Sequence, residues 1–291
     1  MTSFSHAIPF VQEAAPIIRL CWENGWNEAN GGNFSWRLPT DEITGVLARR
    51  YPNVARGAAT PLPQPQPSLD GEYFLVTGTG QFFRHATEYP EQVFGIVQIV
   101  EGGTACQTVW GFENGGRPTS EFATHLVGHA TRKRISGGRE RVVLHCHVPE
   151  FIALSFLMPL DSRTLTLALW EKMPECIVIF PDGVRVVPPL LPGTVKIAEA
   201  SARELEKGRV ISWSHHGIFA SEESPEKVFT LVETVEKASG IHRRVLSAGG
   251  PKRGIDKALL AELASYFAKM MVCPPDLLEE PARDAAVEPT E

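Results

Sequence analysis

The sequence predicts a single α/β domain with a mostly antiparallel central β-sheet covered by helices on both faces. Short apolar runs recur along the chain and are separated by turns rich in glycine and proline, which is typical of strands joined by hairpins. Segments with apolar residues at helical spacing lie between these runs. Strand and helix do not alternate regularly, so a parallel sheet built from βαβ units is not expected.

The first hundred residues predict one helix followed by strands. Residues 9–27 carry apolar side chains at helical spacing, and Asn24-Gly25 is expected to end that helix. Five prolines between positions 52 and 67 predict that residues 39–70 form a long surface insertion without regular helix or central strand. The expected strands are Asn33–Leu38, Tyr73–Thr77, Val93–Val100 and Ala105–Trp110, the last two forming a hairpin through Glu101-Gly102-Gly103.

The rest of the chain predicts further helices and short strands. Pro118-Thr119-Ser120-Glu121 is expected to open a helix through a hydroxyl cap, and Pro149 suits the first turn of another. The expected strands are Arg141–Leu144, a hairpin of Ile177–Phe180 and Val184–Val187, then Val210–Trp213 and Ile218–Ala220. The expected later helices cover 194–207, 225–246 and 256–270. The domain spans 1–276, and the acidic, proline-containing tail 277–291 predicts disorder.

Composition narrows the class of protein. A hydrophobic content of 43% in 291 residues supports a sizeable core, and a net charge of −6 argues against nucleic acid as a partner. No apolar run is long enough to span a membrane, and no basic segment followed by an apolar one marks a signal peptide. Five scattered cysteines without a CxxC pair predict reduced thiols and a cytoplasmic protein.

His145-Cys146-His147 is the strongest indication of a metal site. Side chains two apart on a strand point to one face, so these imidazoles can share a cation while Cys146 packs in the core. A third ligand is available at His215-His216, and spacing does not choose between the two. Three histidines with an open position are typical of catalytic zinc, whereas four closed ligands are typical of structural zinc. Two unrelated histidines, one of them buried, are the ordinary alternative.

Three further fragments could hold an anion. Asn30-Gly31-Gly32-Asn33 permits close backbone approach, and Thr77-Gly78-Thr79-Gly80 exposes amides and hydroxyls after a strand without being a Walker loop or a GxGxxG fingerprint. Thr119-Ser120-Glu121 places hydroxyls and a carboxylate at a helix N-terminus. Each fragment alone also fits an ordinary loop or cap.

Two other histidine patterns are weaker. His125 and His129 lie four apart on the predicted helix, but the catalytic glutamate of an HExxH motif is missing, so packed or surface histidines are favoured. His-x-His with Glu150 nearby also occurs in double-stranded β-barrel metalloproteins. The pattern after Pro149 predicts a helix rather than a strand, which disfavours that barrel.

Five motifs taken in chain order resemble the class II aldolase/adducin family. They are Asn30-Gly31-Gly32-Asn33, Thr77-Gly78-Thr79-Gly80, Pro118-Thr119-Ser120-Glu121, His145-Cys146-His147 and His215-His216-Gly217. The resemblance covers roughly residues 10–270 and includes the proline-rich insertion. Longer strings are similar to family members that act on L-rhamnulose 1-phosphate: Leu75 to Arg84, Leu169-Trp170-Glu171 with Pro174-Glu175-Cys176, and Phe180-Pro181-Asp182-Gly183-Val184.

The resemblance implies a role for each matching residue. It implies one Zn²⁺ per subunit, bound by His145, His147 and His216, and a catalytic carboxylate at Glu121. It also implies that Glu175 enters a neighbouring subunit's site. The implied phosphate-binding residues are Asn30, Gly32, Asn33, Thr79, Gly80, Thr119 and Ser120. Thr79 stands where serine is usual, and His215, a possible rival ligand, stands where an aromatic residue is usual.

The family resemblance also implies a reaction and an assembly. The expected reaction is zinc-dependent retro-aldol cleavage of L-rhamnulose 1-phosphate to dihydroxyacetone phosphate and L-lactaldehyde through a metal-stabilised enediolate. The expected assembly is a homotetramer with sites at subunit interfaces. The alternatives are another sugar-phosphate aldolase, an epimerase or a dehydratase of the family, and a structural-zinc protein. A non-enzymatic, adducin-like module would lack the metal ligands present here.

Overall fold

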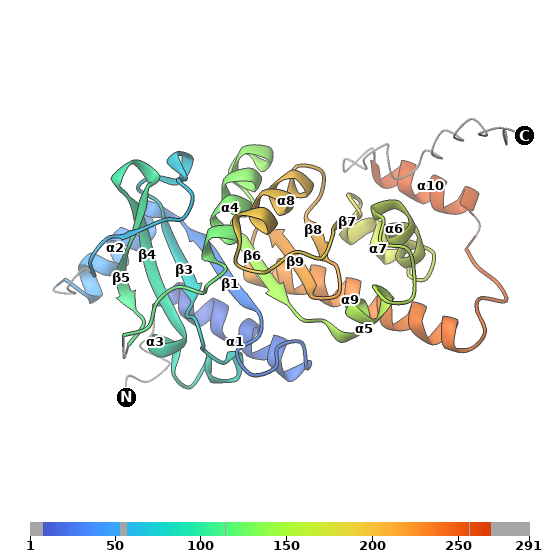
Figure 1. Ribbon diagram of the computed structural model, residues 1–291, viewed down its shortest axis with the longest axis horizontal. Helices are drawn as coiled ribbons and strands as arrows, with labels where there is room; N and C mark the ends of the chain where they lie inside the picture. Colours follow the sequence, from blue (N-terminus) through green and yellow to red (C-terminus); the bar gives the residue numbers. More distant parts are fainter. Residues whose placement is uncertain (1–7, 53–56, 114, 256, 269–291) are drawn as a thin grey trace, which may run out of the picture.

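The computed structural model describes residues 8–52, 57–113, 115–255 and 257–268 (Figure 1). The predicted tail 277–291 lies outside these residues. A nine-stranded sheet with the order β2-β5-β4-β3-β1-β6-β9-β8-β7 runs through them. Its strands are β1 Asn33–Leu38, β2 Thr60–Pro61, β3 Tyr73–Thr77, β4 Phe94–Val100, β5 Ala105–Gly111, β6 Val142–Cys146, β7 Val184–Val187, β8 Val210–Trp213 and β9 Gly217–Glu222.

The sheet is mostly antiparallel, as predicted. Seven of the neighbouring strand pairs are antiparallel, and only β7 with β8 is parallel. The predicted bounds of β1 and β3 are confirmed residue for residue, and β4 and β5 form the predicted hairpin. Alternation and turn residues act locally, so these strands could be read without knowledge of the fold.

Helices cover both faces of the sheet (Figure 1). On one face lie α4 (Phe122–Ser136) and α8 (Val195–Leu205); on the other lie α1 (Pro9–Glu23) and α9 (Pro225–Ser247). The remaining helices are α2 Thr40–Arg50, α3 Pro90–Val93, α5 Pro149–Leu154, α6 Ser162–Trp170, α7 Glu175–Ile179 and α10 Lys257–Ala268, with 3-10 turns at Pro67–Leu69, Phe83–His85 and Glu101–Gly103. No helix in the described part of the chain has the length and hydropathy to cross a bilayer.

Strand β6 separates the two halves of the core. Leu144 and Cys146 belong to the large apolar cluster shared with α1 and α9, whereas Val143 belongs to the cluster that packs under α8. The prediction that Cys146 points into the core is therefore confirmed. Burying each such apolar side chain contributes about 1.5–3 kcal/mol. By the same alternation His145 shares the face of Val143, the side of α4 and α8.

The proline-rich insertion is only partly irregular. Residues 40–50 form α2, and the prediction that no regular helix occurs in 39–70 is wrong for this segment. The prolines that suggested an irregular chain stand at 52 and beyond, while Pro39 occupies the N-cap position. Ile43 and Val46, three apart, bury one face of α2 on the large core cluster. Packing thus stabilises a helix whose own sequence is polar.

The predicted hairpin around Pro181-Asp182-Gly183 is also wrong. Residues Glu175–Ile179 form the short helix α7, and β7 pairs in parallel with β8 instead. A four-residue apolar run does not distinguish a strand from a buried helical turn. Cys176 and Ile177 are buried in the core cluster, so tertiary packing decided the conformation.

The topology gathers the sequence motifs at one edge of the sheet. Strands β3, β1, β6 and β9 are consecutive neighbours, and each is antiparallel to the next. The start of β1, the end of β3, the end of β6 and the start of β9 therefore lie at the same edge. Asn33 pairs directly with His145 across the β1–β6 ladder. Motifs far apart in the chain are thus brought side by side.

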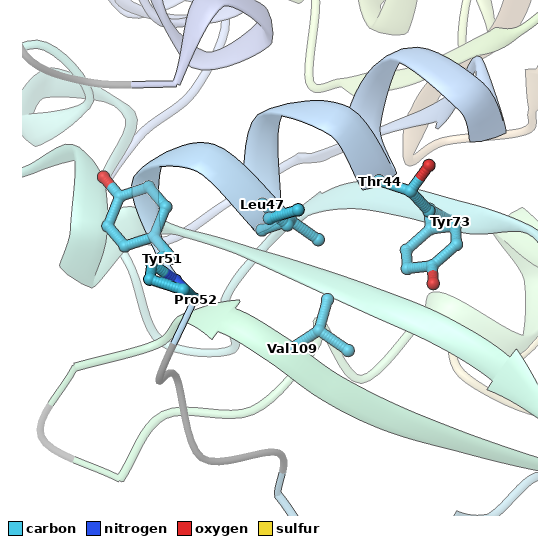
Figure 2. A pocket seen from close by; sticks show the side chains of 7 residues that line it. Thr44, Leu47, Tyr51, Pro52, Tyr73 and Val109 are labelled. Atoms are coloured by element: carbon cyan, nitrogen blue, oxygen red, sulfur yellow. The ribbon is translucent and has the colours of Figure 1, made fainter.

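A separate hollow of about 210 Å³ lies between α2 and the sheet (Figure 2). Its walls are mainly apolar or aromatic and come from Leu47, Tyr51, Pro52, Tyr73 and Val109. No carboxylate, imidazole or thiol lines it. The volume of a hollow therefore does not indicate where the residues with catalytic side chains lie in this fold.

Candidate active site

Three imidazoles converge at the edge where the motifs meet. His145 is the last but one residue of β6, and His147 is the first residue after that strand. His216 lies in the turn between β8 and β9. One ligand atom from each ring lies within 4.8 Å of the other two. The ring centroids are 5.0 Å apart for His145 and His147, 4.8 Å for His145 and His216, and 5.0 Å for His147 and His216.

The β8–β9 turn brings His216, and not His215, into this cluster. The His216 amide donates to the Trp213 carbonyl at 2.9 Å, and His215 adopts a positive φ of 62°. The His215 ring is turned away, with Nδ1 2.9 Å from the Ser155 hydroxyl. A side chain at Gly217 would come within 2.3 Å of the Cys146 carbonyl, so only glycine fits after His216.

The nitrogen atoms in the cluster suit a divalent cation. His145 Nδ1 lies 2.8 Å from the Ile218 carbonyl and His147 Nδ1 lies 2.9 Å from the Glu28 carboxylate, so each ring keeps Nε2 for another partner. His216 Nδ1 has no hydrogen-bond partner among the described residues. Burial lowers the pKa of His145 well below its ordinary range and that of His216 to about 4. Both rings are thus neutral at pH 7, which is the form that binds metals.

Glu121 faces the three imidazoles. Its Oε2 atom lies 3.9 Å from His145 Nε2 and accepts a hydrogen bond of 2.6 Å from the Asn33 amide. Burial raises the pKa of Glu121, although the Asn33 hydrogen bond and the nearby His147 oppose this shift. A raised pKa makes this carboxyl group a better proton acceptor than an exposed glutamate, which suits a general acid–base role.

The predicted hydroxyl cap of the following helix is wrong. Glu121 is itself the N-cap residue of α4, and no side chain caps that helix. The Thr119 hydroxyl instead accepts a long hydrogen bond, 3.4 Å, from the Glu121 amide. The Glu121 carboxyl group points to Asn33 on β1 and His145 on β6.

The predicted phosphate-binding residues meet in one pocket of about 160 Å³. The pocket is lined by Asn30, Gly31, Gly32, Asn33, Gly78, Thr79, Gly80, Thr119, Ser120, Glu121, His145, His147 and His216. The Thr119 amide donates to the Thr77 carbonyl at 2.9 Å, and the Thr79 amide to the Arg117 carbonyl at 2.9 Å. These bonds hold the two hydroxyl-bearing segments together at the pocket wall.

Steric contacts explain why glycine is needed at Gly32 in the Asn30-Gly31-Gly32-Asn33 motif. Gly32 has a φ of +73°, and a Cβ there would lie 1.8 Å from the Asn27 amide nitrogen and 2.7 Å from the His145 carbonyl. Any larger residue would push the loop off the end of β6. The motif thus keeps Asn30 and Asn33 next to the imidazoles.

Glu175 is the one predicted site residue that the fold does not bring to this pocket. It is exposed at the start of α7 and does not line the pocket. Its expected contribution to a neighbouring subunit's site stays a prediction.

Several neighbours of the site were missed by sequence reasoning. Glu28 holds His147, and the Trp213 ring lies 4.5 Å from the His145 ring as an apolar wall. Neither residue belongs to a recognisable motif. His125 and His129 were expected to be packed or surface side chains; both are fully buried and bound to Ser35. The available signal was the spacing of two polar pairs. Asn33 and Ser35 share one face of a strand, and His125 and His129 share one face of a helix, so the two pairs could have been expected to meet.

Comparison with known proteins places the sequence among aldolases. The family model described as Class II Aldolase and Adducin N-terminal domain matches residues 12–242. The chain is 38% identical over 258 residues to proteins named rhamnulose-1-phosphate aldolase from Yersinia pseudotuberculosis serotype IB and from Yersinia pestis. These alignments cover 89% of this chain and 93% of each relative.

Solved structures show the same fold. A sugar-phosphate aldolase from Thermotoga maritima is similar with a TM-score of 0.70 and 27% identity, covering 83% of this chain and 97% of that one. An L-fuculose 1-phosphate aldolase is similar in fold, with a TM-score of 0.58 and 19% identity over 90% and 97% of the two chains. The mostly antiparallel sheet between helices is therefore an architecture that these proteins share.

Proposed function

The chain belongs to the class II aldolase and adducin family, and from that membership we propose that it cleaves L-rhamnulose 1-phosphate to dihydroxyacetone phosphate and L-lactaldehyde. The chain is an aldolase, a carbon–carbon lyase of the metal-dependent class. The substrate is inferred from the rhamnulose-1-phosphate aldolases that are 38% identical over most of their length. The observation that carries the proposal is the pocket in which three imidazoles and a buried carboxyl group face two hydroxyl-rich loops.

His145, His147 and His216 would hold a zinc ion. Three imidazoles leave an open coordination position, which favours a catalytic over a structural site. When bound, the cation supplies positive charge that stabilises negative charge developing on the substrate oxygens during C3–C4 cleavage. Glu28 and the Ile218 carbonyl keep two of the three rings oriented for this purpose.

The hydroxyl-rich loops would bind the substrate phosphate. Thr79, Thr119 and Ser120 offer hydroxyl donors, Asn30 offers an amide, and Gly80, with a positive φ of 72°, lines the same pocket. The Asn33 amide already donates one hydrogen to Glu121, so its share in phosphate binding would come from the second hydrogen. Binding the phosphate here places the reacting carbons toward the imidazoles.

Glu121 would move the proton at C3. As the C3–C4 bond breaks, the C4 hydroxyl gives its proton to ionised Glu121, its oxygen leaves as the aldehyde, and the electron pair stays on the three-carbon fragment. A protonated Glu121 then gives its proton to C3, which completes dihydroxyacetone phosphate. The raised pKa of this buried carboxyl group suits such a donor.

The expected assembly is a homotetramer with sites at subunit interfaces, and exposed apolar side chains near the site support a subunit contact there. Phe156 and Leu157 are 68% and 55% exposed, and the Phe156 ring packs 4.3 Å from His215, beside the metal-site turn. Leu191 is 74% exposed. Subunit contacts would cover these side chains. Analytical ultracentrifugation should give the mass of four chains; a monomer mass at assay concentration would contradict this assembly.

The direct test is retro-aldol turnover of L-rhamnulose 1-phosphate. The zinc-loaded protein should release dihydroxyacetone phosphate and L-lactaldehyde in equal amounts, and a chelator should abolish the reaction until zinc is restored. Conversion of the sugar phosphate without cleavage would indicate an epimerase or a dehydratase and would contradict the proposal. L-fuculose 1-phosphate provides the comparison substrate, and it should be cleaved less efficiently.

Replacing Thr119 with alanine should mainly raise KM. Thr119 is buried at the pocket wall, and losing a hydrogen bond to a charged phosphate costs about 1.5–3 kcal/mol, or roughly 10–100-fold in KM. Steady-state kinetics and competition by inorganic phosphate measure this effect. Thr104→Ala, in the β4–β5 connection, is the matched control. An effect confined to kcat would contradict a phosphate contact at Thr119.

A further inference from the structure

A chain of hydrogen bonds runs from Glu121 into the core between β1 and α4. The Asn33 amide nitrogen lies 2.6 Å from Glu121 Oε2, and the Asn33 oxygen contacts His125 Nε2. The Ser35 hydroxyl lies 2.7 Å from His125 Nδ1 and 2.7 Å from His129 Nε2. Ser35, His125 and His129 are fully buried.

Each hydrogen bond in this chain has only one possible direction when Glu121 is ionised. A carboxylate only accepts, so Asn33 gives its NH₂ group to Glu121 and presents its oxygen to His125. His125 must then donate from Nε2, and its bare Nδ1 must accept from the Ser35 hydroxyl. With its hydrogen used, the Ser35 oxygen accepts from His129 Nε2.

Burial keeps both histidines neutral, as this pattern requires. It lowers the pKa of His125 to about 3 and that of His129 well below its ordinary range. In a doubly protonated His125 the Nδ1 atom would be a donor, and the Ser35 hydroxyl hydrogen would lose its acceptor there. His129 Nδ1 accordingly has no partner among the described residues, and the chain ends there against the Phe74 ring.

Ordinary packing does not need these side chains. The neighbouring contact between β3 and α4 is built from apolar residues such as Phe74, Phe122 and Leu126. Buried polar side chains are tolerated only where each is hydrogen-bonded, and a partly bonded network destabilises the fold. Here the network ends on the one carboxyl group that faces the imidazoles.

We propose that His125 is a positioning residue: its Nε2–H, oriented by Ser35 and His129, holds the Asn33 amide so that Glu121 is presented to the substrate in one fixed orientation. This inference rests on the proposed function, because it assumes that Glu121 acts on the substrate. It predicts that the hydrogen-bond donor at the position of His125 Nε2 matters for kcat.

Two substitutions of His125 separate this role from packing. In H125Q the side-chain amide nitrogen stands near the position of Nε2 and can still donate to Asn33. In H125N it stands near the position of Nδ1 and reaches only Ser35. H125N should lower kcat about 10–100-fold, the range for leaving a buried acceptor, here the Asn33 oxygen, without its hydrogen bond, with KM and metal content within about twofold of wild type. H125Q should stay within about fivefold of wild-type kcat.

The control pair is H242Q and H242N. His242 is a buried histidine on α9, outside the site pocket, and its Nδ1 has no partner among the described residues. Neither variant should change kcat more than about twofold. Equal kcat for H125Q and H125N, at unchanged thermal stability and metal content, would overturn the proposal.

A spectroscopic measurement keeps the inference testable without turnover. Solid-state ¹⁵N NMR of histidine-labelled wild-type protein should show His125 and His129 as neutral rings with hydrogen on Nε2. S35A should remove the hydrogen-bond partner of His125 Nδ1, shift the ¹⁵N resonance of that atom and lower kcat about 3–10-fold. A wild-type His125 with hydrogen on Nδ1 would overturn the hydrogen-bond chain. Correct tautomers in a protein that does not cleave L-rhamnulose 1-phosphate would instead refute the proposed function alone.

Discussion

Replacing His147 with alanine is expected to remove the bound divalent metal and the aldolase activity together. His147 supplies one of three imidazoles, and the two that remain cannot by themselves form a three-ligand site. Positive charge at the developing oxyanion contributes several kcal/mol, so kcat/KM should fall about 10³-fold or more. Elemental analysis after gel filtration and retro-aldol turnover measure the two losses. Full metal content with normal turnover would refute the ligand assignment.

Two further variants test whether the expected loss of metal is specific to the proposed ligands. In H215N the turn keeps a residue that tolerates positive φ, and the side chain replaced is turned toward Ser155, so metal content should stay at the wild-type level. Loss of metal there would make His215 a ligand. In E28Q the His147 ring loses its charged partner, and metal affinity should weaken about 10–100-fold without complete loss.

Replacing Glu121 with glutamine should leave the metal in place and lower kcat about 10²–10⁴-fold, the usual contribution of a general acid–base group. Glutamine keeps the volume and can still accept from Asn33, but it cannot carry the proton to C3. Metal content and KM should stay near wild type. Glu88→Gln, in an ion pair with Arg19 outside the pocket, controls for the loss of one negative charge.

Proton exchange isolates the step assigned to Glu121. Wild-type protein should exchange a proton at the hydroxymethyl carbon of dihydroxyacetone phosphate with deuterium from the solvent, because that carbon is C3 of the ketose. E121Q should lose this exchange in proportion to kcat. Wild-type exchange in a variant with slow cleavage would place the role of Glu121 at another step.

Local sequence rules were sufficient for most elements and for the list of motifs. Alternation marked β1, a short apolar run marked β3, turn residues marked the β4–β5 hairpin, and Pro149 marked the start of α5. These signals act between residues that are close in the chain. The same rules failed at α2 and α7, where burial against distant helices and strands outweighed proline content and a short apolar run.

The chain by itself determined which side chains were available: the His-x-His pair, a histidine before glycine, an acid at a helix start and two hydroxyl-rich turns. The tertiary structure brings His216 rather than His215 into the cluster, as the family resemblance implied, and it alone sets Glu121 against Asn33 and adds Glu28 and the buried His125. The physical reason is that these choices depend on strand neighbours and helix packing between residues 60 to 119 positions apart. Spacing along the chain carries no information about such contacts.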